Sequence, residues 1–172
     1  MSVAENGSKV CFVTVGTTSF DPLISAMDDD GIRRVLVERF GITHLRIQYG
    51  RGQVRPTEST LASLKVEAFD FKPTLAEEMK AASLIVSHAG AGSVMEALRL
   101  GRPLIVVVND ALMDNHQVEI AEALEKGHHL AYAPSPKELL DVLRRFNPED
   151  LRKYPNRDTQ AFARMLDREM GL

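Results

Sequence analysis

The sequence predicts an α/β fold in which a doubly wound parallel sheet, covered by helices on both faces, is followed by a helical C-terminal tail. Short, fully apolar runs alternate with amphipathic segments along the chain. Most of these runs end at a glycine or a polar turn. The 172 residues, 44% hydrophobic and 26% charged, suit one ordinary globular core. Strands that are apolar on both sides are typical of parallel sheets buried under helices.

The predicted elements alternate from the start of the chain. Apolar runs and period-two patterns predict the strands, and amphipathic spacing of apolar residues predicts the helices. An acidic run followed by a glycine predicts a break in the first helix at residues 28–31. The predicted strands are 10–15, 44–49, 64–69, 84–87, 104–108 and 130–133; the predicted helices are 21–40, 74–82, 92–100 and 114–126. Residues 50–63 are predicted to form a long polar connection.

Two further helical patterns, over residues 135–145 and 147–170, follow the last strand with no strand between them. We therefore divide the chain into a sheet domain, residues 1–134, and a tail, residues 135–172. The tail carries apolar side chains at helical spacing, which fits docking of a partner and packing onto the chain's own sheet equally well. These are Leu151, Tyr154, Phe162, Met165 and Leu166.

Composition excludes several classes of protein. A net charge of −3 provides no broad basic surface for nucleic acid. No apolar stretch approaches the roughly 20 residues that a membrane span needs, and the polar residues 1–9 lack the apolar core of a signal peptide. The single cysteine, Cys11, lies in an apolar run and is predicted to be a core residue. We expect a cytosolic protein. If it works at a membrane, another molecule must hold it there.

The turn after the strand at 84–87 is the most informative stretch. Gly90, Ala91, Gly92 and Ser93 connect this strand to a helix, so that small residues lie where the first helical N–H groups have no partner. Such a turn lets a phosphate approach the backbone closely. Glu96 follows about one helical turn later, where a carboxylate can reach ribose hydroxyls. The sequence therefore predicts a nucleotide site.

A second turn, after the first strand, contains Gly16, Thr17, Thr18 and Ser19. Its hydroxyl groups either donate to phosphate oxygens or cap the following helix. Capping is the better explanation for this turn alone. Because the carboxyl ends of parallel strands share one edge of the sheet, the second phosphate-type turn there favours ligand contact.

Other cofactor sites are less well supported. Gly90 and Gly92 match two positions of the dinucleotide fingerprint, but Met95 replaces its third glycine. The acidic run at residues 28–30 has no histidine or cysteine at ligand spacing, which favours a solvated turn over a metal site.

Two histidines and a polar cluster adjoin the same predicted edge. His88 and His116 each lie next to a polar turn after a strand, where an imidazole can donate to a ligand or carry a proton. Asn115, His116 and Gln117 provide the groups that bind sugar hydroxyls and an acetamido group. Capping of the helix by Asp114 is the alternative, but it leaves those three side chains unexplained.

These motifs resemble those of the cytosolic catalytic subunits of two-component UDP-N-acetylglucosamine transferases in dolichol-linked oligosaccharide synthesis. More distantly, the chain is similar to the donor-binding half of the bacterial transferase that makes lipid II. The matching stretches cover residues 10 to about 133 in order, and the tail carries none. They are FVTVGTTSFD at 12–21, QYGRG at 48–52, SHAGAGS at 87–93 with Glu96, GRPL at 101–104 and NDALMDNHQ at 109–117.

The resemblance implies a Rossmann-like domain that is the donor half of a GT-B glycosyltransferase. By similarity, Gly16, Thr17 and the turn at residues 90–93 hold the diphosphate, Glu96 holds the ribose, and the uracil meets the backbone near Phe71. Asn115, His116 and Gln117 face the GlcNAc.

The resemblance also implies the reaction and the partner. GlcNAc passes from UDP-GlcNAc to GlcNAc-diphosphodolichol with inversion, without metal or other cofactor. A membrane-anchored subunit carries the acceptor half and recruits this chain to the cytosolic face of the endoplasmic reticulum. The general base comes from that partner or from near the interface, with His88 and His116 as candidates in this chain. A non-catalytic nucleotide-binding or regulatory domain is the alternative, but intact Glu96 and residues 115–117 favour the enzyme.

Overall fold

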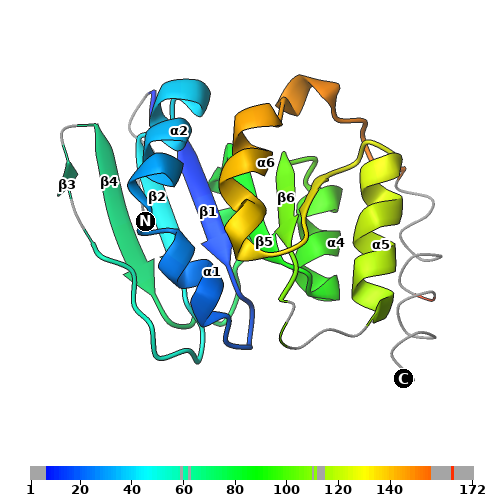
Figure 1. Cartoon of the computed structure of the whole chain (residues 1–172), viewed down its shortest axis with the longest axis horizontal. Coiled ribbons are helices and arrows are strands. Elements are labelled where there is room, and N and C mark those ends of the chain that lie inside the picture. Colours follow the sequence, from blue (N-terminus) through cyan, green and yellow to red (C-terminus); the bar gives the residue numbers. More distant parts are fainter. Residues whose placement is uncertain are drawn as a thin grey trace.

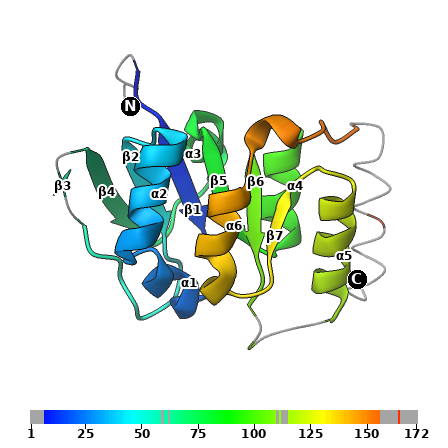
Figure 2. The same ribbon diagram turned by 45° about the horizontal axis from the view of Figure 1, so that its top comes forward.

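A seven-stranded sheet in the order β3-β4-β2-β1-β5-β6-β7 forms the centre of the structure (Figure 1; β7 is labelled in Figure 2). The computed structural model describes residues 7–58, 60–61, 63–109, 111, 115–155 and 164; at positions 60, 61, 115 and 116 it describes only the backbone. The strands are β1 Val10–Thr14, β2 His44–Gln48, β3 Thr60–Leu61, β4 Leu64–Phe69, β5 Leu84–His88, β6 Leu104–Val107 and β7 Ala131–Ala133. The helices are α1 Asp21–Ala26, α2 Asp30–Phe40, α3 Ala76–Ala81, α4 Ala91–Arg99, α5 Asn115–Lys126 and α6 Leu139–Arg145, with short 3-10 turns at Pro136–Glu138 and Pro148–Asp150.

Six of the strands are parallel, which confirms the doubly wound, Rossmann-like sheet that the sequence predicts. The chain starts in the middle of the sheet: Val13 of β1 is level with Ile47 of β2 on one side and Val86 of β5 on the other. The strands after β1 add outward in one direction through β2 and β4, and in the other through β5, β6 and β7. The topological switch point therefore lies between β1 and β5, where ligands of such sheets bind.

Alternate residues of β1 pack into two separate core layers, one on each face of the sheet. Cys11 and Val13 pack with α1, α2 and α6 on one face, whereas Phe12 packs with α3, α4 and α5 on the other. Figure 1 and Figure 2 both show α1, α2 and α6 together on one side of the sheet. Cys11 is fully buried, and burial raises the pKa of its thiol to about 12, which confirms it as a core residue.

The edge strand β3 is a difference from the sequence-based expectation. Residues 50–63 were expected to contain no strand, but Thr60 and Leu61 pair antiparallel with Lys65 and Leu64. Two residues are too few for a periodic signal, so the pairing has no local signature.

The predicted helix over residues 147–170 is wrong where the structure describes it. After the 3-10 turn Pro148–Asp150, residues 151–155 are not helical. The N–H group of Arg152 donates to the carbonyl of His128 at 2.6 Å, and Tyr154 meets the His129 ring edge-on. The physical reason is Pro155, which removes a helical donor and disfavours helical geometry at Tyr154. Phe162, Met165 and Leu166 lie outside the described residues.

The earlier part of the tail packs on the sheet. Leu139, Val142, Leu143 and Phe146 belong to the core layer that also contains α1 and α2. The division of the chain at residue 134 stays a prediction. Among the described helices, none has the length and apolar character needed to cross a membrane.

Candidate functional site

A cavity of about 490 Å³ lies at the carboxyl ends of the strands, at the switch point between β1 and β5. Its volume is in the range of small-molecule sites. Three segments provide most of its lining, namely the turn after β1, the loop from β4 into α3 and the turn from β5 into α4, and the end of β2 adds Gln48. The lining residues are Gly16, Thr17, Gln48, Phe71, Lys72, Pro73, Thr74, Leu75, Met79, His88, Gly90, Gly92, Ser93 and Glu96.

The start of α4 forms one wall of the cavity. Gly90 is the N-cap in extended geometry (φ −79°, ψ 129°), and no side chain caps the helix. Val94 makes the first helical bond to the Gly90 carbonyl at 3.0 Å, whereas the N–H groups of residues 91–93 have no acceptor within the described part of the chain. Gly90, Gly92 and Ser93 line the cavity. Unpaired N–H groups at a helix start favour an anion there.

The side-chain amide of Gln48 fixes the opposite wall. It is 1% exposed, and its Oε1 accepts from the Thr14 hydroxyl at 2.6 Å and from the N–H groups of Val15 and Gly16 at 3.1 and 3.0 Å. Its Nε2 donates to the carbonyls of Gly16 at 2.7 Å and Asp70 at 2.9 Å. One amide therefore joins the turn after β1 to the loop after β4.

Two glycines let the imidazole of His88 lie between the two phosphate-type turns. Gly16 has φ +66°, and a Cβ there would lie 2.7 Å from Nε2 of His88. A Cβ on Gly90 would overlap Cε1 and Nε2 of the same ring. The imidazole therefore packs directly against both backbones, which explains why glycine is needed at both positions.

Burial lowers the pKa of the His88 imidazole from 6.5 to about 4. A group with this pKa is neutral at pH 7. His88 therefore lines the cavity as a neutral ring that can donate one N–H bond, and its low pKa makes it a weak base.

Phe71 and Glu96 complete the cavity. Phe71 is 64% exposed, and no other large apolar side chain among the described residues is so open to solvent. An exposed aromatic ring beside a cavity suits stacking on a flat ligand such as a nucleobase. Glu96 lies on α4, beyond the helix start, so that its carboxylate faces the same space.

The structure brings most of the predicted site residues together. Gly16, Thr17, Phe71, His88, Gly90, Gly92, Ser93 and Glu96 all line the cavity. Ala91 lies at the helix start but not on the cavity wall, and Gln117 at the start of α5 does not line it either. The hydroxyl of Thr18 donates to the carbonyl of Val15 at 2.9 Å, which is a turn contact, not a cavity contact. The side chains of Asn115 and His116 lie outside the described residues.

The acidic run at residues 28–30 has structural functions. Asp29 caps α2 by accepting from the Ile32 N–H at 2.9 Å, and Asp28 pairs with Arg33 at 2.8 Å. Within the described ranges, no three carboxylate, imidazole or thiol groups gather as metal ligands.

Six residues of the cavity were not predicted from the sequence: Gln48, Lys72, Pro73, Thr74, Leu75 and Met79. Gln48 lies at the end of a predicted strand. A polar residue at a strand position that is expected to be buried was the signal that could have identified it. Lys72 and Thr74 adjoin Phe71 in sequence, so extending the predicted contact by a few residues would have included them.

The fold and the cavity at its switch point are those of a Rossmann-like α/β domain. More narrowly, the chain belongs to the family of the glycosyltransferase family 28 C-terminal domain, whose model matches residues 10–169.

Comparisons with individual proteins agree with this family. The mouse UDP-N-acetylglucosamine transferase subunit ALG13 is 44% identical over 142 residues, which cover 78% of this chain but 12% of that protein. The chain thus spans a small part of the mouse relative. The Saccharomyces cerevisiae protein of the same name is 33% identical over 191 residues, covering 92% of this chain and 94% of that one.

Solved structures show the same fold. The NMR structure of ALG13 superposes with a TM-score of 0.71 at 31% identity and covers 94% of this chain and 96% of that chain. The crystal structure of Acinetobacter baumannii MurG has a TM-score of 0.64 at 18% identity, covering 98% of this chain and 51% of that one.

Replacing Gln48 with leucine is expected to lower the free energy of unfolding by about 2–4 kcal/mol, because the five hydrogen bonds of the buried amide are lost and the buried Thr14 hydroxyl loses its acceptor. Urea denaturation measures the loss. The control is Gln53→Leu at an exposed position, which should stay within about 0.5 kcal/mol of wild type. Equal stability of the two variants would contradict the structural importance of the amide.

Replacing Gly90 with alanine is expected to destabilise the chain by about 1–3 kcal/mol, since the new methyl group overlaps the His88 ring. Gly92→Ala is the matched control two residues later: its Cβ meets no atom within 4 Å, so the helix should be as stable or gain up to about 1 kcal/mol. Thermal melts of both variants decide between these outcomes, and a harmless Gly90→Ala would show that His88 does not pack there.

Acidification is expected to destabilise the chain through His88. Because the pKa of this imidazole is about 4 in the fold and 6.5 in the unfolded chain, the unfolded state binds more protons below pH 6.5. Stability from the neutral ring is complete above pH 6.5 and falls as the pH drops towards 4, by about 2 kcal/mol at pH 5. Urea denaturation at pH 7 and pH 5 should show a smaller loss for His88→Gln; an equal loss would exclude His88 as the cause.

Proposed function

We propose that this chain is the donor-binding, catalytic subunit of an N-acetylglucosaminyltransferase that uses UDP-GlcNAc. One observation carries the proposal: the cavity joins the unpaired N–H groups of α4, the carboxylate of Glu96 and the exposed ring of Phe71. These three features suit the phosphates, the ribose and the base of a nucleoside diphosphate. Membership of the glycosyltransferase family and the names of the relatives support it.

In the proposed complex, the diphosphate lies between the α4 start and the turn at Gly16 and Thr17. Glu96 accepts hydrogen bonds from the ribose, and the uracil lies against the loop at Phe71. His88, which is neutral, donates one N–H bond to the diphosphate. Asn115, His116 and Gln117 face the GlcNAc, as the resemblance implies.

We infer an inverting displacement that needs no metal. The acceptor hydroxyl oxygen forms a bond to the anomeric carbon from the face opposite UDP. The bond to the diphosphate breaks, and its electron pair stays on the phosphate oxygen. The N–H groups at the α4 start are aimed at that developing charge before the reaction begins. The proton of the acceptor passes to a base from the partner or to one of the two candidates in this chain, His88 and His116.

The proposed acceptor is GlcNAc-diphosphodolichol, which a membrane-anchored partner subunit presents at the cytosolic face of the endoplasmic reticulum. We assign the cavity at this sheet edge to the donor, and we propose that the partner subunit holds the acceptor. The word subunit in the names of the relatives supports a complex of this kind.

Calorimetric titration of the purified chain, alone and with the partner, tests the proposal with UDP-GlcNAc, UDP-glucose and NAD. We expect UDP-GlcNAc to bind best and Glu96→Ala to weaken it by about tenfold or more, because a charged acceptor to the ribose is lost. The control is Glu77→Ala on α3, whose side chain is 84% exposed and outside the cavity.

Two outcomes would contradict the proposal. Absence of nucleotide binding in both the free chain and the complex would exclude a donor site. Binding of UDP-GlcNAc without transfer in the complex would favour the non-catalytic nucleotide-binding domain.

A further inference from the structure

Lys72 brings a positive charge to the cavity. Of the described residues that line it, Lys72 is the sole lysine or arginine and Glu96 the sole carboxylate. His88 is neutral there at pH 7. A nucleoside diphosphate brings more than one negative charge into this space, so the cavity needs more compensation than backbone N–H groups provide.

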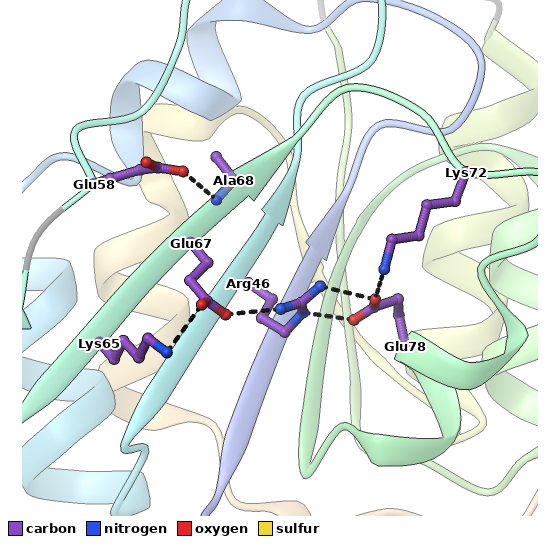
Figure 3. Close-up of polar contacts among 7 residues, drawn as sticks. All are labelled: Arg46, Glu58, Lys65, Glu67, Ala68, Lys72 and Glu78. Atoms are coloured by element: carbon purple, nitrogen blue, oxygen red, sulfur yellow. Dashed lines mark hydrogen bonds and ion pairs between the residues drawn. The ribbon is translucent and has the colours of Figure 1, made fainter. Parts of the chain in front are cut away.

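The ammonium group of Lys72 is held by two residues that do not line the cavity. It forms an ion pair with Glu78 of α3 and lies 4.6 Å from the centre of the Phe69 ring. Figure 3 shows the side chain pointing from the loop towards α3. The side chain of Lys72 is 41% exposed, compared with 11% for Glu78.

Glu78 does not depend on Lys72 for its charge balance. Arg46 donates to both of its carboxylate oxygens, from Nε to Oε2 at 2.6 Å and from Nη2 to Oε1 at 2.9 Å. Burial alone would raise the pKa of the Glu78 carboxyl, but the hydrogen bonds from Arg46 and Lys72 hold it below its usual value. A bidentate guanidinium pair of this kind is the strong form of ion pair.

The whole network carries one cation in excess. Arg46 also donates to Glu67 at 2.7 Å, and Glu67 pairs with Lys65 at 3.0 Å (Figure 3). Lys65, Arg46 and Lys72 thus face two carboxylates. If Lys72 leaves, two cations and two carboxylates remain and no buried charge is left unpaired, which avoids the usual penalty of breaking a buried pair.

We propose that Lys72 is the cation of the diphosphate site, and that it exchanges its ion pair with Glu78 for one with the diphosphate when the nucleotide enters. This inference rests on the proposed function. The flexible four-carbon stem lets the ammonium group turn from Glu78 into the cavity that the residue already lines. Glu78 and Arg46 stay paired behind it.

Calorimetry of the full chain with UDP, and NMR titration with uridine, test the exchange in three variants. Lys72→Met should weaken UDP binding about tenfold or more, leave uridine binding unchanged and reduce the salt dependence of UDP binding. The matched control is Lys65→Met, which removes the cation at the other end of the same network. It should bind UDP within about twofold of wild type. Glu78→Gln, which releases Lys72, should bind UDP as well as wild type or better.

The outcomes separate this inference from the proposed function. Wild-type binding of UDP by Lys72→Met would overturn the inference alone. Equal weakening by Lys72→Met and Glu78→Gln would also overturn it, because the ion pair would then act by holding the loop in place. Loss of uridine binding in Lys72→Met would lead to the same conclusion. If the wild-type chain and its complex bind no UDP, the proposed function and this inference both fail.

Discussion

The buried amide of Gln48 is the interaction on which the rest of the site depends. Five hydrogen bonds use its oxygen and both hydrogens of its nitrogen, and they connect three segments that are distant in sequence: the ends of β1 and β2 and the loop after β4. A buried amide left partly unsatisfied is costly, so these segments are held in one arrangement. The walls of the cavity that carry Gly16 and Phe71 are therefore fixed relative to each other.

The imidazole of His88 connects the turn after β1 to the start of α4. It fits only because Gly16 and Gly90 have no Cβ. The same burial that positions the ring keeps it neutral, which means that it adds no charge beside the helix start. The electrostatics of the cavity then depend on backbone dipoles, the carboxylate of Glu96 and the ammonium group of Lys72.

The parts of this structure that sequence predicts well are local ones. Apolar runs give the parallel strands, and the glycines at positions 16, 90 and 92 mark turns because their consequences are confined to a few residues. The bonds of Gln48 to Thr14 and Gly16, and the pairing of Arg46 with Glu78, join positions that are 32 or more residues apart. No periodic pattern in the sequence predicts such contacts. The tail illustrates a different failure: the apolar spacing of Leu151 and Tyr154 suggested a helix, although Pro155 was a local signal against it.

In the proposed complex, the fixed N–H groups of α4 and the exchangeable cation Lys72 contribute differently to binding the substrate and to releasing the product. In that complex, the N–H groups of α4 cannot move away, so they would favour charge on the diphosphate both during the reaction and afterwards, when the product must leave. The proposed role of Lys72 is different, because Glu78, its partner in the structure, would compete with the diphosphate for it at every stage. That competition would reduce the net contribution of Lys72 to the affinity for the product. The charge of Lys72 would still be available to the diphosphate during the reaction. Since Arg46 keeps Glu78 ionised and in place, this competing partner is ready whenever the diphosphate departs.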